Sequence, residues 1–473
     1  MNRRDFLRHM ALLYAAAHFN CGRKKMRPNI LFILTDDQKY NAIHALGNDE
    51  IITPHMDELV RRGLTFRNAY IMGGLSAAVC MPSRASLLTG KSVFRLKDSG
   101  REIPESHATM PETFRKNGYV TFGTGKWHNA PSSYARSFSN GAKIFFGGMS
   151  THWKIPMFDF DPSGQYDASD QYISEGVHSS EVYATAAVDF LNDYEGKEPF
   201  FMYVAFQAPH DPREMPEKFR KLYDADNLSL PDNFLPRHPF DNGELEVRDE
   251  KLAAFPRSGD EVRRHIADYY GIITHLDEQI GRITAALRDN GYLEDTIIVL
   301  AGDNGLALGE HGLMGKQNVY EHSVKVPLIM SGPGVPTDAE SDTLCYLTDL
   351  FPTLCRLSKI DIPDSCEGVA IGDVIHGTQP APREALFFAY KNFQRAIRTD
   401  RYKLNLYQVK GEKRAQLFDL ESDPGEMNDL SGDPAYGQTI QDLSGKLQNM
   451  LGNAGDEAKL DEKEWGVAEI PPW

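Results

Sequence analysis

The stretch 28-PNILFILTDDQ-38 places a continuous apolar run directly before two adjacent carboxylates, Asp36 and Asp37. A run of this length and composition is typical of a strand buried on both faces of a sheet. The stretch 296-TIIVLAGDNG-305 has the same arrangement: its apolar run is followed by Asp303 and Asn304. Both stretches predict buried strands that present oxygen-bearing side chains just beyond their last apolar residue.

Two more stretches follow the same plan. The segment 200-FFMYVAFQAPH-210 ends in His210, and 119-YVTFGTGKWH-128 ends in Lys126 and His128. Strand-like and helix-like segments alternate along the chain, which is the pattern of an α/β fold. In an open, mostly parallel sheet the functional crevice lies beyond the carboxyl ends of the strands. We therefore expect these polar ends to converge on one place.

The convergence would bring together three carboxylates and one amide, from Asp36, Asp37, Asp303 and Asn304. Taken separately, each pair also fits a turn or a helix cap. Together they match the oxygen ligands of a hard cation, which would also relieve their mutual repulsion. We expect calcium in preference to magnesium. The sequence contains no closely spaced cysteine and histidine ligands of the zinc type.

The stretch 78-AVCMPSRASLLTG-90 predicts a short helix with Ser83 as its N-cap and Gly90 at its end. Cys80 then lies just before the helix N-terminus. This position, with Arg84 nearby, favours a reactive thiolate, and a buried structural cysteine is the alternative. Neither interpretation accounts for Pro82.

Composition limits the classes of function. The 473-residue chain has 51 basic and 67 acidic residues and a formal net charge of −16, which argues against a nucleic-acid partner. An anionic substrate would need a local basic pocket. Five cysteines in a chain of this length do not form a disulfide framework, so we expect buried free thiols.

The N-terminus, residues 1–25, reads as an export signal. Arg3 and Arg4 precede Phe6 and Leu7 and a short apolar stretch, as in twin-arginine signals. We therefore expect an exported, periplasmic protein. Cys21 is a candidate lipid anchor, although its preceding residues match that signal poorly. We expect no transmembrane segment, because no other run is long enough to cross a bilayer.

The C-terminal part has a different pattern. Residues 385–420 alternate apolar and polar positions over short runs separated by turns, which predicts antiparallel strands, and residues 436–451 have helical spacing. We therefore expect the C-terminal part to form a smaller α+β unit of antiparallel strands and a helix.

Cys80, Pro82, Ser83 and Arg84 together resemble the C-x-P-S-R signature of the type I sulfatases. The resemblance extends to "NILFILTDDQ", "TFGTGKWH", "AFQAPHDP", "VLAGDNG" and "HGLMGKQNVYEHSVKVPLI". It implies an alkaline phosphatase-like α/β fold, with a catalytic domain over residues 27–380 that contains a large mixed sheet flanked by helices, and a smaller α+β domain of antiparallel strands over residues 381–473. Met81 and Lys325 depart from the residues common at their positions, and neither departure threatens the resemblance.

The resemblance also implies an activity, the hydrolysis of sulfate esters. A formylglycine maturation enzyme would convert Cys80 to formylglycine, which would bind calcium with Asp36, Asp37, Asp303 and Asn304. Lys126 and Lys316 would stabilise negative charge on the sulfate, and Arg84 would hold the nucleophile. His210 would protonate the leaving group, assisted by Lys126, and His128 would remove a proton to release sulfate.

The substrate is the least defined part. Residues 146–166 are rich in aromatic residues and glycine and could form a sugar-binding wall, with His152 and Trp153 as candidates. Aromatic clusters of this kind also occur as ordinary core. The resemblance implies a sulfated carbohydrate, and 4-O-sulfated galactose or N-acetylgalactosamine is the specific expectation. The alternatives are a phosphonate or phosphate ester hydrolase of the same superfamily and a non-catalytic glycan-binding protein.

Overall fold

Strand β1, Asn29–Thr35, lies inside an eight-stranded mixed sheet in the computed structural model, which describes residues 27–375, 382–462 and 465. β1 pairs in parallel with β10 on one side and with β9 on the other. The order across the sheet is β12 (Ala339–Ser341), β2 (Gly63–Phe66), β11 (Leu328–Ser331), β10 (Thr296–Gly302), β1, β9 (Phe200–Ala205), β5 (Val120–Lys126) and β6 (Asn140–Phe145).

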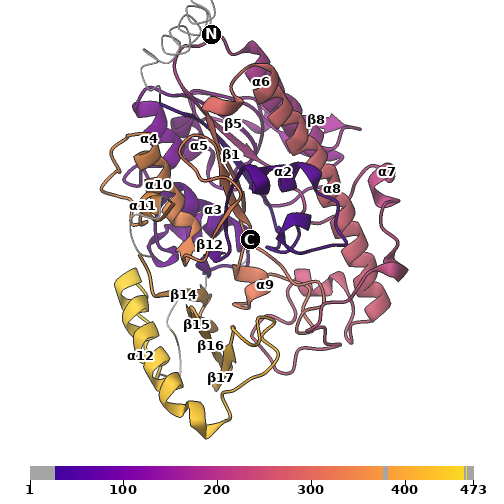
Figure 1. Cartoon of the computed structure of the whole chain (residues 1–473), viewed down its shortest axis with the longest axis vertical. Coiled ribbons are helices and arrows are strands. Elements are labelled where there is room, and N and C mark those ends of the chain that lie inside the picture. The colour runs from indigo at the N-terminus through magenta and orange to yellow at the C-terminus, as the bar shows by residue number, and fades with distance from the viewer. Residues whose placement is uncertain (1–26, 376–381, 463–464, 466–473) are drawn as a thin grey trace, which may run out of the picture.

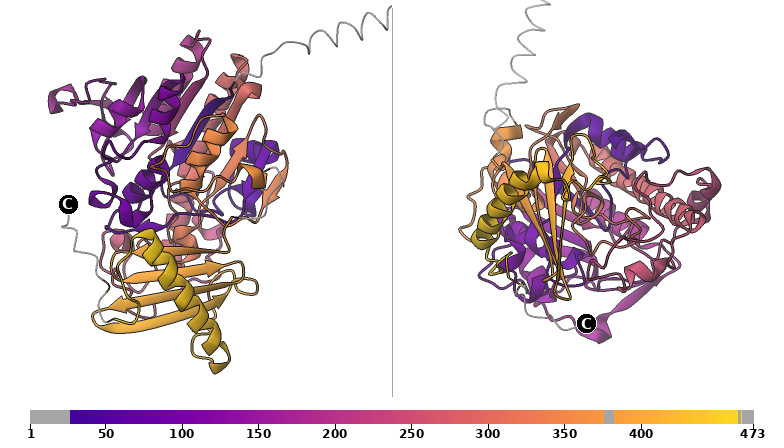
Figure 2. Two further views of the ribbon diagram at one scale, coloured as in Figure 1. Left: turned by 90° about the vertical axis from the view of Figure 1, so that its left-hand side faces the viewer. Right: turned by 90° about the horizontal axis from the view of Figure 1, so that it is seen from below.

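Helices cover both faces of this sheet (Figures 1 and 2). The larger helices on one face are α2 (Pro54–Arg62), α6 (Ser179–Asp193) and α8 (Gly259–Asp289). The other face carries α3 (Cys80–Thr89), α4 (Met110–Lys116), α5 (Pro131–Ser137) and α10 (Leu350–Leu357). Three single-turn helices, α7 (Glu217–Arg220), α9 (Glu321–Val324) and α11 (Gly372–Ile375), lie in the connections.

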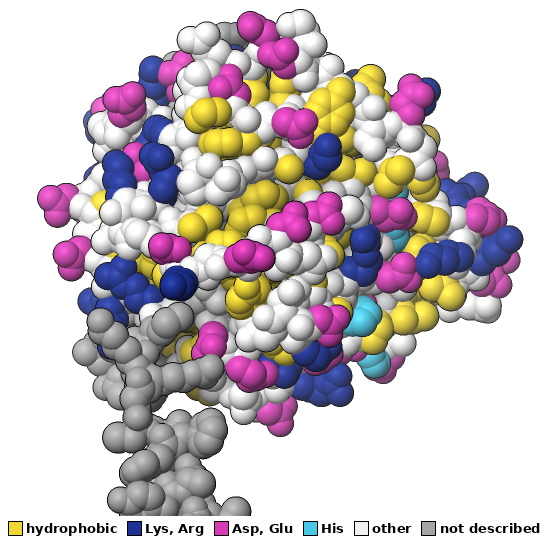
Figure 3. Space-filling model, turned by 90° about the horizontal axis from the view of Figure 1, so that it is seen from above, with side chains coloured by type: hydrophobic (Ala, Val, Ile, Leu, Met, Phe, Trp, Pro, Cys, Tyr) yellow, Lys and Arg dark blue, Asp and Glu magenta, His cyan; other side chains and the backbone are white. Residues whose placement is uncertain are grey.

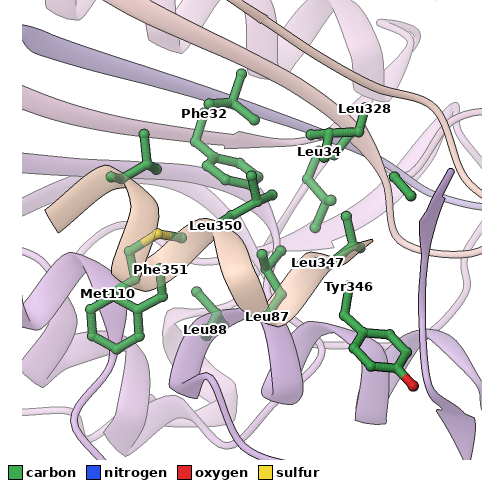
Figure 4. Close-up of a cluster of buried hydrophobic side chains, with 14 of the residues drawn as sticks. Phe32, Leu34, Leu87, Leu88, Met110, Leu328, Tyr346, Leu347, Leu350 and Phe351 are labelled. Carbon is green, nitrogen blue, oxygen red and sulfur yellow. The ribbon is translucent and has the colours of Figure 1, made fainter. Parts of the chain in front are cut away.

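The sequence of β1 explains why it is central. Ile30, Phe32 and Leu34 enter the core on one face, and Leu31 and Ile33 enter the core on the other. Figure 4 shows Phe32 and Leu34 in a cluster with side chains of α3 and α10. Full burial of such a side chain contributes about 1.5–3 kcal/mol. The strand is thus held by packing on both of its faces.

The C-terminal part forms the antiparallel sheet expected from its alternating pattern. Its strands are β14 (Ala385–Tyr390), β15 (Gln394–Thr399), β16 (Tyr402–Val409) and β17 (Glu412–Asp419), and α12 (Gly437–Ala454) packs across them (Figure 2). A fifth strand, β4 (Gly73–Gly74), comes from the N-terminal half and pairs in parallel with β14. The two parts of the chain are therefore joined by main-chain hydrogen bonds six residues before Cys80.

The remaining strands form two small pairs. β3 (Ala69–Tyr70) lies parallel to β13 (Cys345–Tyr346), and β7 (Lys154–Met157) is antiparallel to β8 (Tyr172–Glu175). The fold class predicted from the sequence is confirmed. The predicted boundary between residues 380 and 381 stays a prediction, because residues 376–381 lie outside the described part of the chain.

The expected convergence of strand ends is present. β10, β1, β9 and β5 are consecutive and parallel, so the residues that follow them meet at one edge of the sheet.

Figure 3 shows acidic and basic side chains interspersed over one face of the molecule. Within the described residues, no helix combines the length and apolarity needed to cross a membrane. The predicted export signal and Cys21 lie outside these residues.

Gly125 fixes how the end of β5 approaches β9. Its φ is +94°, and an added Cβ would lie 1.9 Å from the carbonyl oxygen of Ala205. Gly118 has a similar φ of +83° but has open space around the same position. Gly125→Ala should cost about 3 kcal/mol of unfolding free energy, because backbone strain and displacement of β5 add.

Gly118→Ala is the matched control and should cost about 1 kcal/mol from conformation alone. Urea denaturation followed by circular dichroism measures both values. Equal losses in the two variants would show that the contact with Ala205 does not restrain β5.

Candidate active site at the carboxyl ends of four strands

The residues predicted from the four strand ends lie together and are almost fully removed from solvent. Asp36 and Asp37 follow β1, Asp303 and Asn304 follow β10, and Lys126 ends β5. The further members of the group are Cys80, Arg84, His128, His210 and Lys316. All of these except His128 are less than 5% exposed. The sheet thus gathers polar side chains that would be costly to bury singly.

Three carboxylates form the centre of the group. Carboxylate oxygens of Asp36, Asp37 and Asp303 lie close enough to share one metal ion. The Asp303 Oδ1 atom accepts a hydrogen bond from the Asp37 main-chain nitrogen at 3.1 Å. The Oδ1 atoms of Asp36 and Asn304 are buried without any hydrogen-bond partner. Unsatisfied buried oxygens in such a cluster call for a further positive group.

Three cations surround the carboxylates. Arg84 Nε donates to Asp303 Oδ2 at 2.7 Å, and Lys316 Nζ donates to Asp37 Oδ1 at 2.6 Å. Lys126 Nζ pairs with Asp36. The Asp37 carboxylate raises the pKa of Lys316 well above its usual value, against the effect of burial. Three positive and three negative side chains therefore balance one another before any metal or substrate is present.

The surroundings shift the pKa values of Asp36 and Asp303 in opposite directions. Burial would raise the pKa of Asp36, but Lys126 and other cations hold it well below its usual range. Burial and the neighbouring Asp36 charge raise the pKa of Asp303. Of these two carboxylates, Asp303 is therefore the one whose negative charge is less well stabilised by its surroundings. A divalent cation would stabilise that charge, so the residues fit a hard-metal site.

The donor set fits calcium or magnesium rather than a soft metal. Asp36, Asp37, Asp303 and Asn304 offer oxygen atoms, and an oxygen-bearing group at residue 80 would add to them. A bound ion here would add positive charge for an anionic substrate. The local charge would then oppose the overall net charge of −16.

Cys80 is the first residue of α3 and lies between two amino groups. Its Sγ atom is 3.7 Å from Lys316 Nζ and 4.0 Å from Lys126 Nζ. Burial nevertheless raises the pKa of the Cys80 thiol to about 11, despite both lysines. The expectation of a reactive thiolate is therefore wrong for the unmodified residue. The surroundings keep the thiol neutral.

The start of α3 differs from the prediction. The helix begins at Cys80 rather than after Ser83, and Ser83 Oγ donates to the Asp303 carbonyl at 2.5 Å instead of capping the helix. Pro82 lies in the first turn of the helix. Main-chain N–H groups in this turn have no partner within the helix, so the missing N–H of proline costs no hydrogen bond. The predicted end at Gly90 is confirmed by its left-handed conformation. The four described cysteines are free thiols, as expected.

The two candidate proton-transfer groups are His210 and His128. His210 Nδ1 lies 2.7 Å from the Asp211 carbonyl oxygen, so Nδ1 carries a hydrogen and Nε2 is the exchangeable position. Nε2 is 3.7 Å from Asp37 Oδ2. Burial lowers the pKa of His128 well below its usual value, and the Lys126 and Arg84 cations lower it further. His128 is therefore neutral near pH 7, as a base must be.

His152 is placed behind the site. It is 0% exposed, its Nδ1 contacts Ser179 Oγ at 2.7 Å, and its Nε2 contacts the His210 carbonyl at 3.1 Å. This placement favours support of the His210 main chain over contact with substrate, because both ring nitrogens are occupied. Trp153 is half-buried, and its ring packs on the edge of His178.

Several site neighbours were missed by the sequence analysis. Asp211 directly follows His210, so its position in "APHDP" could have drawn attention to it. Gln317 likewise follows Lys316. Arg248, Asp249 and Glu250 lie in an irregular segment with no recognisable pattern, and only the fold brings them to the site.

Comparisons with known proteins agree with this geometry. A family model described as "Sulfatase" matches residues 28–360, and one described as "N-sulphoglucosamine sulphohydrolase, C-terminal" matches residues 309–453. The arylsulfatase of Clostridium perfringens is 29% identical, with 88% of this chain and 93% of the relative covered. The ulvan-active sulfatase of Formosa agariphila is 30% identical, with 92% and 83% covered.

A solved structure described as a complex with its substrate D-glucosamine-2-N,6-O-disulfate shares the fold. Its TM-score is 0.79 at 22% sequence identity, and the match covers 92% of this chain and 100% of that chain. At this level of identity the likeness concerns the fold alone.

Removing the charge of Asp303 tests the metal site. Asp303→Asn should weaken calcium binding by at least about 10-fold and reduce activity with it, because the remaining carboxylates balance a divalent ion poorly. Titration calorimetry on protein stripped with a chelator measures the affinity. Asp349→Asn is the control, because Asp349 is also buried and pairs with Arg383 away from these strand ends. Unchanged calcium binding in Asp303→Asn would contradict the site.

Proposed function

The chain belongs to the sulfatase family, and we propose that it hydrolyses sulfate esters of a sulfated carbohydrate with a formylglycine at position 80. It is a sulfuric ester hydrolase. The observation that carries the proposal is the placement of Cys80. Its side chain lies between Lys126 and Lys316 at the meeting point of the carboxylate-bearing strand ends, within the C-x-P-S-R signature.

The side chains around residue 80 suit attack on a sulfate ester. A hydrated aldehyde at residue 80 supplies two hydroxyl groups on one carbon, one to attack sulfur and one through which the sulfate is later released. Asp36, Asp37, Asp303 and Asn304 would hold a calcium ion, which supplies positive charge for the sulfate oxygens. Lys126 and Lys316 add preorganised positive charge, and Arg84 is fixed by Asp303 and by the Lys126 carbonyl at 2.6 Å.

His210 and His128 divide the proton transfers. His210 presents Nε2 next to Asp37, so in its doubly protonated form it can give the Nε2 proton to the departing alcohol oxygen while Nδ1–H stays bound to the Asp211 carbonyl. His128 lies on the other flank beyond Lys126, with its Nδ1 atom buried and unpartnered. A neutral imidazole there can accept the proton whose removal releases sulfate. The lowered pKa of His128 keeps it in that form down to mildly acidic pH.

The sugar and the position of its sulfate remain proposals. The name of the ulvan-active relative supports a sulfated polysaccharide or oligosaccharide as the substrate class. Within that class we propose 4-O-sulfated galactose or N-acetylgalactosamine. The alternatives are a phosphonate or phosphate ester substrate and a glycan-binding protein in which Cys80 stays unmodified.

Cys80→Ser tests the nucleophile. A serine can attack sulfur once but lacks the second hydroxyl, so the variant should bind substrate and fail to turn over, with kcat lower by at least about 10³-fold. The mass of the peptide containing residue 80 is measured alongside sulfate release. Full activity of wild-type protein whose peptide shows only unmodified cysteine would overturn the formylglycine proposal.

The same assay, run over a panel, decides the substrate class. The panel contains sulfated mono- and disaccharides with defined sulfate positions, together with phosphate and phosphonate monoesters. Faster hydrolysis of the phosphorus esters would favour the alternative esterase. Sugar binding without any hydrolysis, by protein with unmodified Cys80, would favour the glycan-binding alternative.

We also propose export to the periplasm, motivated by Arg3, Arg4 and the apolar stretch that follows. Arg3→Lys with Arg4→Lys should leave the precursor in the cytoplasm, because twin-arginine export depends on the arginine pair. Cell fractionation with N-terminal sequencing measures this. Lipid on Cys21 would appear as a mass increase on the mature N-terminal peptide. An uncleaved wild-type protein confined to the cytoplasm would contradict export.

A further inference from the structure

Three consecutive side chains, Arg248, Asp249 and Glu250, connect two loops of the active site. They lie at the start of a 3₁₀ turn, Asp249–Leu252. Arg248 reaches Asp211, next to His210, whereas Asp249 and Glu250 reach the loop that carries Lys316. We refer to residues 248–250 as the bracket.

The geometry points to the bracket as a set of positioning residues for the sulfatase reaction: we propose that Arg248 orients the proton donor His210, and that Asp249 and Glu250 hold Lys316. This inference rests on the proposed function and assigns separate tasks to neighbouring residues. None of the three side chains needs to touch the reacting atoms.

The Arg248 arm acts through Asp211. Both terminal nitrogens of the guanidinium pair with the two oxygens of the Asp211 carboxylate, the NH2 contact being 2.9 Å. Asp211 is itself buried, and its main-chain carbonyl receives the His210 Nδ1 hydrogen at 2.7 Å. A two-pronged pair fixes orientation as well as distance. Arg248 therefore helps to keep His210 Nε2 turned toward Asp37.

The other arm holds the backbone before Lys316 and the side chain that follows it. Glu250 accepts hydrogen bonds from the main-chain nitrogens of Met314 at 3.0 Å and Gly315 at 2.9 Å. Asp249 Oδ2 accepts from Gln317 Nε2 at 2.8 Å. Two side chains of the bracket thus bind three residues that flank Lys316, at positions 314, 315 and 317.

Two details indicate that this second arm is tightly built. Arg257, 0% exposed at its side chain, pairs with the Glu250 carboxylate and supplies the charge that burial of Glu250 requires. At Gly315 an added Cβ would lie 2.9 Å from Glu250 Oε1, so a glycine is needed for the carboxylate to come this close.

The bracket joins parts of the site that the sheet does not join directly. His210 follows β9, whereas Lys316 lies in the loop after β10, on the far side of β1. Through Asp37, which contacts both His210 and Lys316, the two groups share one carboxylate at the centre. The bracket provides a second connection from the outside. It limits how far either group can turn away from that carboxylate.

The two arms predict different kinetic signatures. Protonation by His210 matters most when the departing oxygen is strongly basic, whereas Lys316 acts on the sulfate group whatever the leaving group. The test uses two substrates: phenyl sulfate, which releases a poor leaving group, and 4-nitrophenyl sulfate, which releases a good one. Arg248→Lys, which keeps the charge and loses the fork, should lower kcat on phenyl sulfate about 10-fold more than on 4-nitrophenyl sulfate.

Glu250→Gln should lower kcat on both esters by the same factor, of about 10 to 100, because it loosens the Lys316 loop. Arg67→Lys is the matched control: Arg67 also makes a two-pronged pair, with Asp342, and its side chain is 46% exposed, like that of Arg248. The control should leave both rates unchanged. Thermal melting shows whether each variant folds, and Asp211→Asn replaces Arg248→Lys if that variant does not.

A second readout does not require turnover. In nitrogen-15 spectra recorded at a pH where His210 is neutral, the wild-type ring should show a single Nδ1–H tautomer, the form left once Nε2 has given up its proton. The signal is identified by its loss in His210→Gln. Arg248→Lys should shift that signal toward a mixture of tautomers, and Arg67→Lys should not. An unchanged His210 signal in Arg248→Lys, or equal rate losses on the two esters, would overturn the inference. A wild type that hydrolyses no sulfate ester, with a normal His210 signal, would instead refute the proposed function.

Discussion

The structure depends on the close approach of three buried carboxylates at the ends of neighbouring parallel strands. Asp36, Asp37 and Asp303 repel one another, and a low-dielectric interior strengthens that repulsion. Arg84, Lys126 and Lys316 make their burial tolerable, each by a direct pairing with one carboxylate. The same balance would prepare the site for chemistry: a divalent cation would shift it toward positive charge, which an anionic ester would then partly offset.

The four neighbouring strands β10, β1, β9 and β5 of the central sheet could be predicted from sequence because their signal is local. The runs that became β1 and β10 are apolar over residues 30–34 and 297–301 respectively, and the pairing of such strands in parallel places their polar ends together. The same logic identified Lys126 and His210. These predictions needed only the pattern of apolar and polar residues and the rule that the carboxyl ends of parallel strands lie at the same edge of the sheet.

Other features depend on contacts between distant segments and left no such signal. The pKa of Cys80 is decided by burial, which a helix start and a nearby arginine do not reveal. Ser83 could not be distinguished from a helix cap without knowing that the Asp303 carbonyl lies within reach. His152 looked like a member of an aromatic wall, yet its two ring nitrogens are used by Ser179 and His210. Arg248, Asp249 and Glu250 also could not be identified from the sequence, because only contacts between distant segments bring them to the site.

The pairing of β4 with β14 has a consequence for the timing of events during synthesis. Cys80 is 2% exposed in the finished fold, so an enzyme that modifies its side chain must reach it earlier. The Gly73–Gly74 segment that leads to Cys80 completes its hydrogen bonds only after Ala385–Tyr390 has been made. A ribosome must therefore translate most of the chain before this region can close. Any enzymatic modification of Cys80 would therefore have to take place before the sheet that contains β4 and β14 assembles.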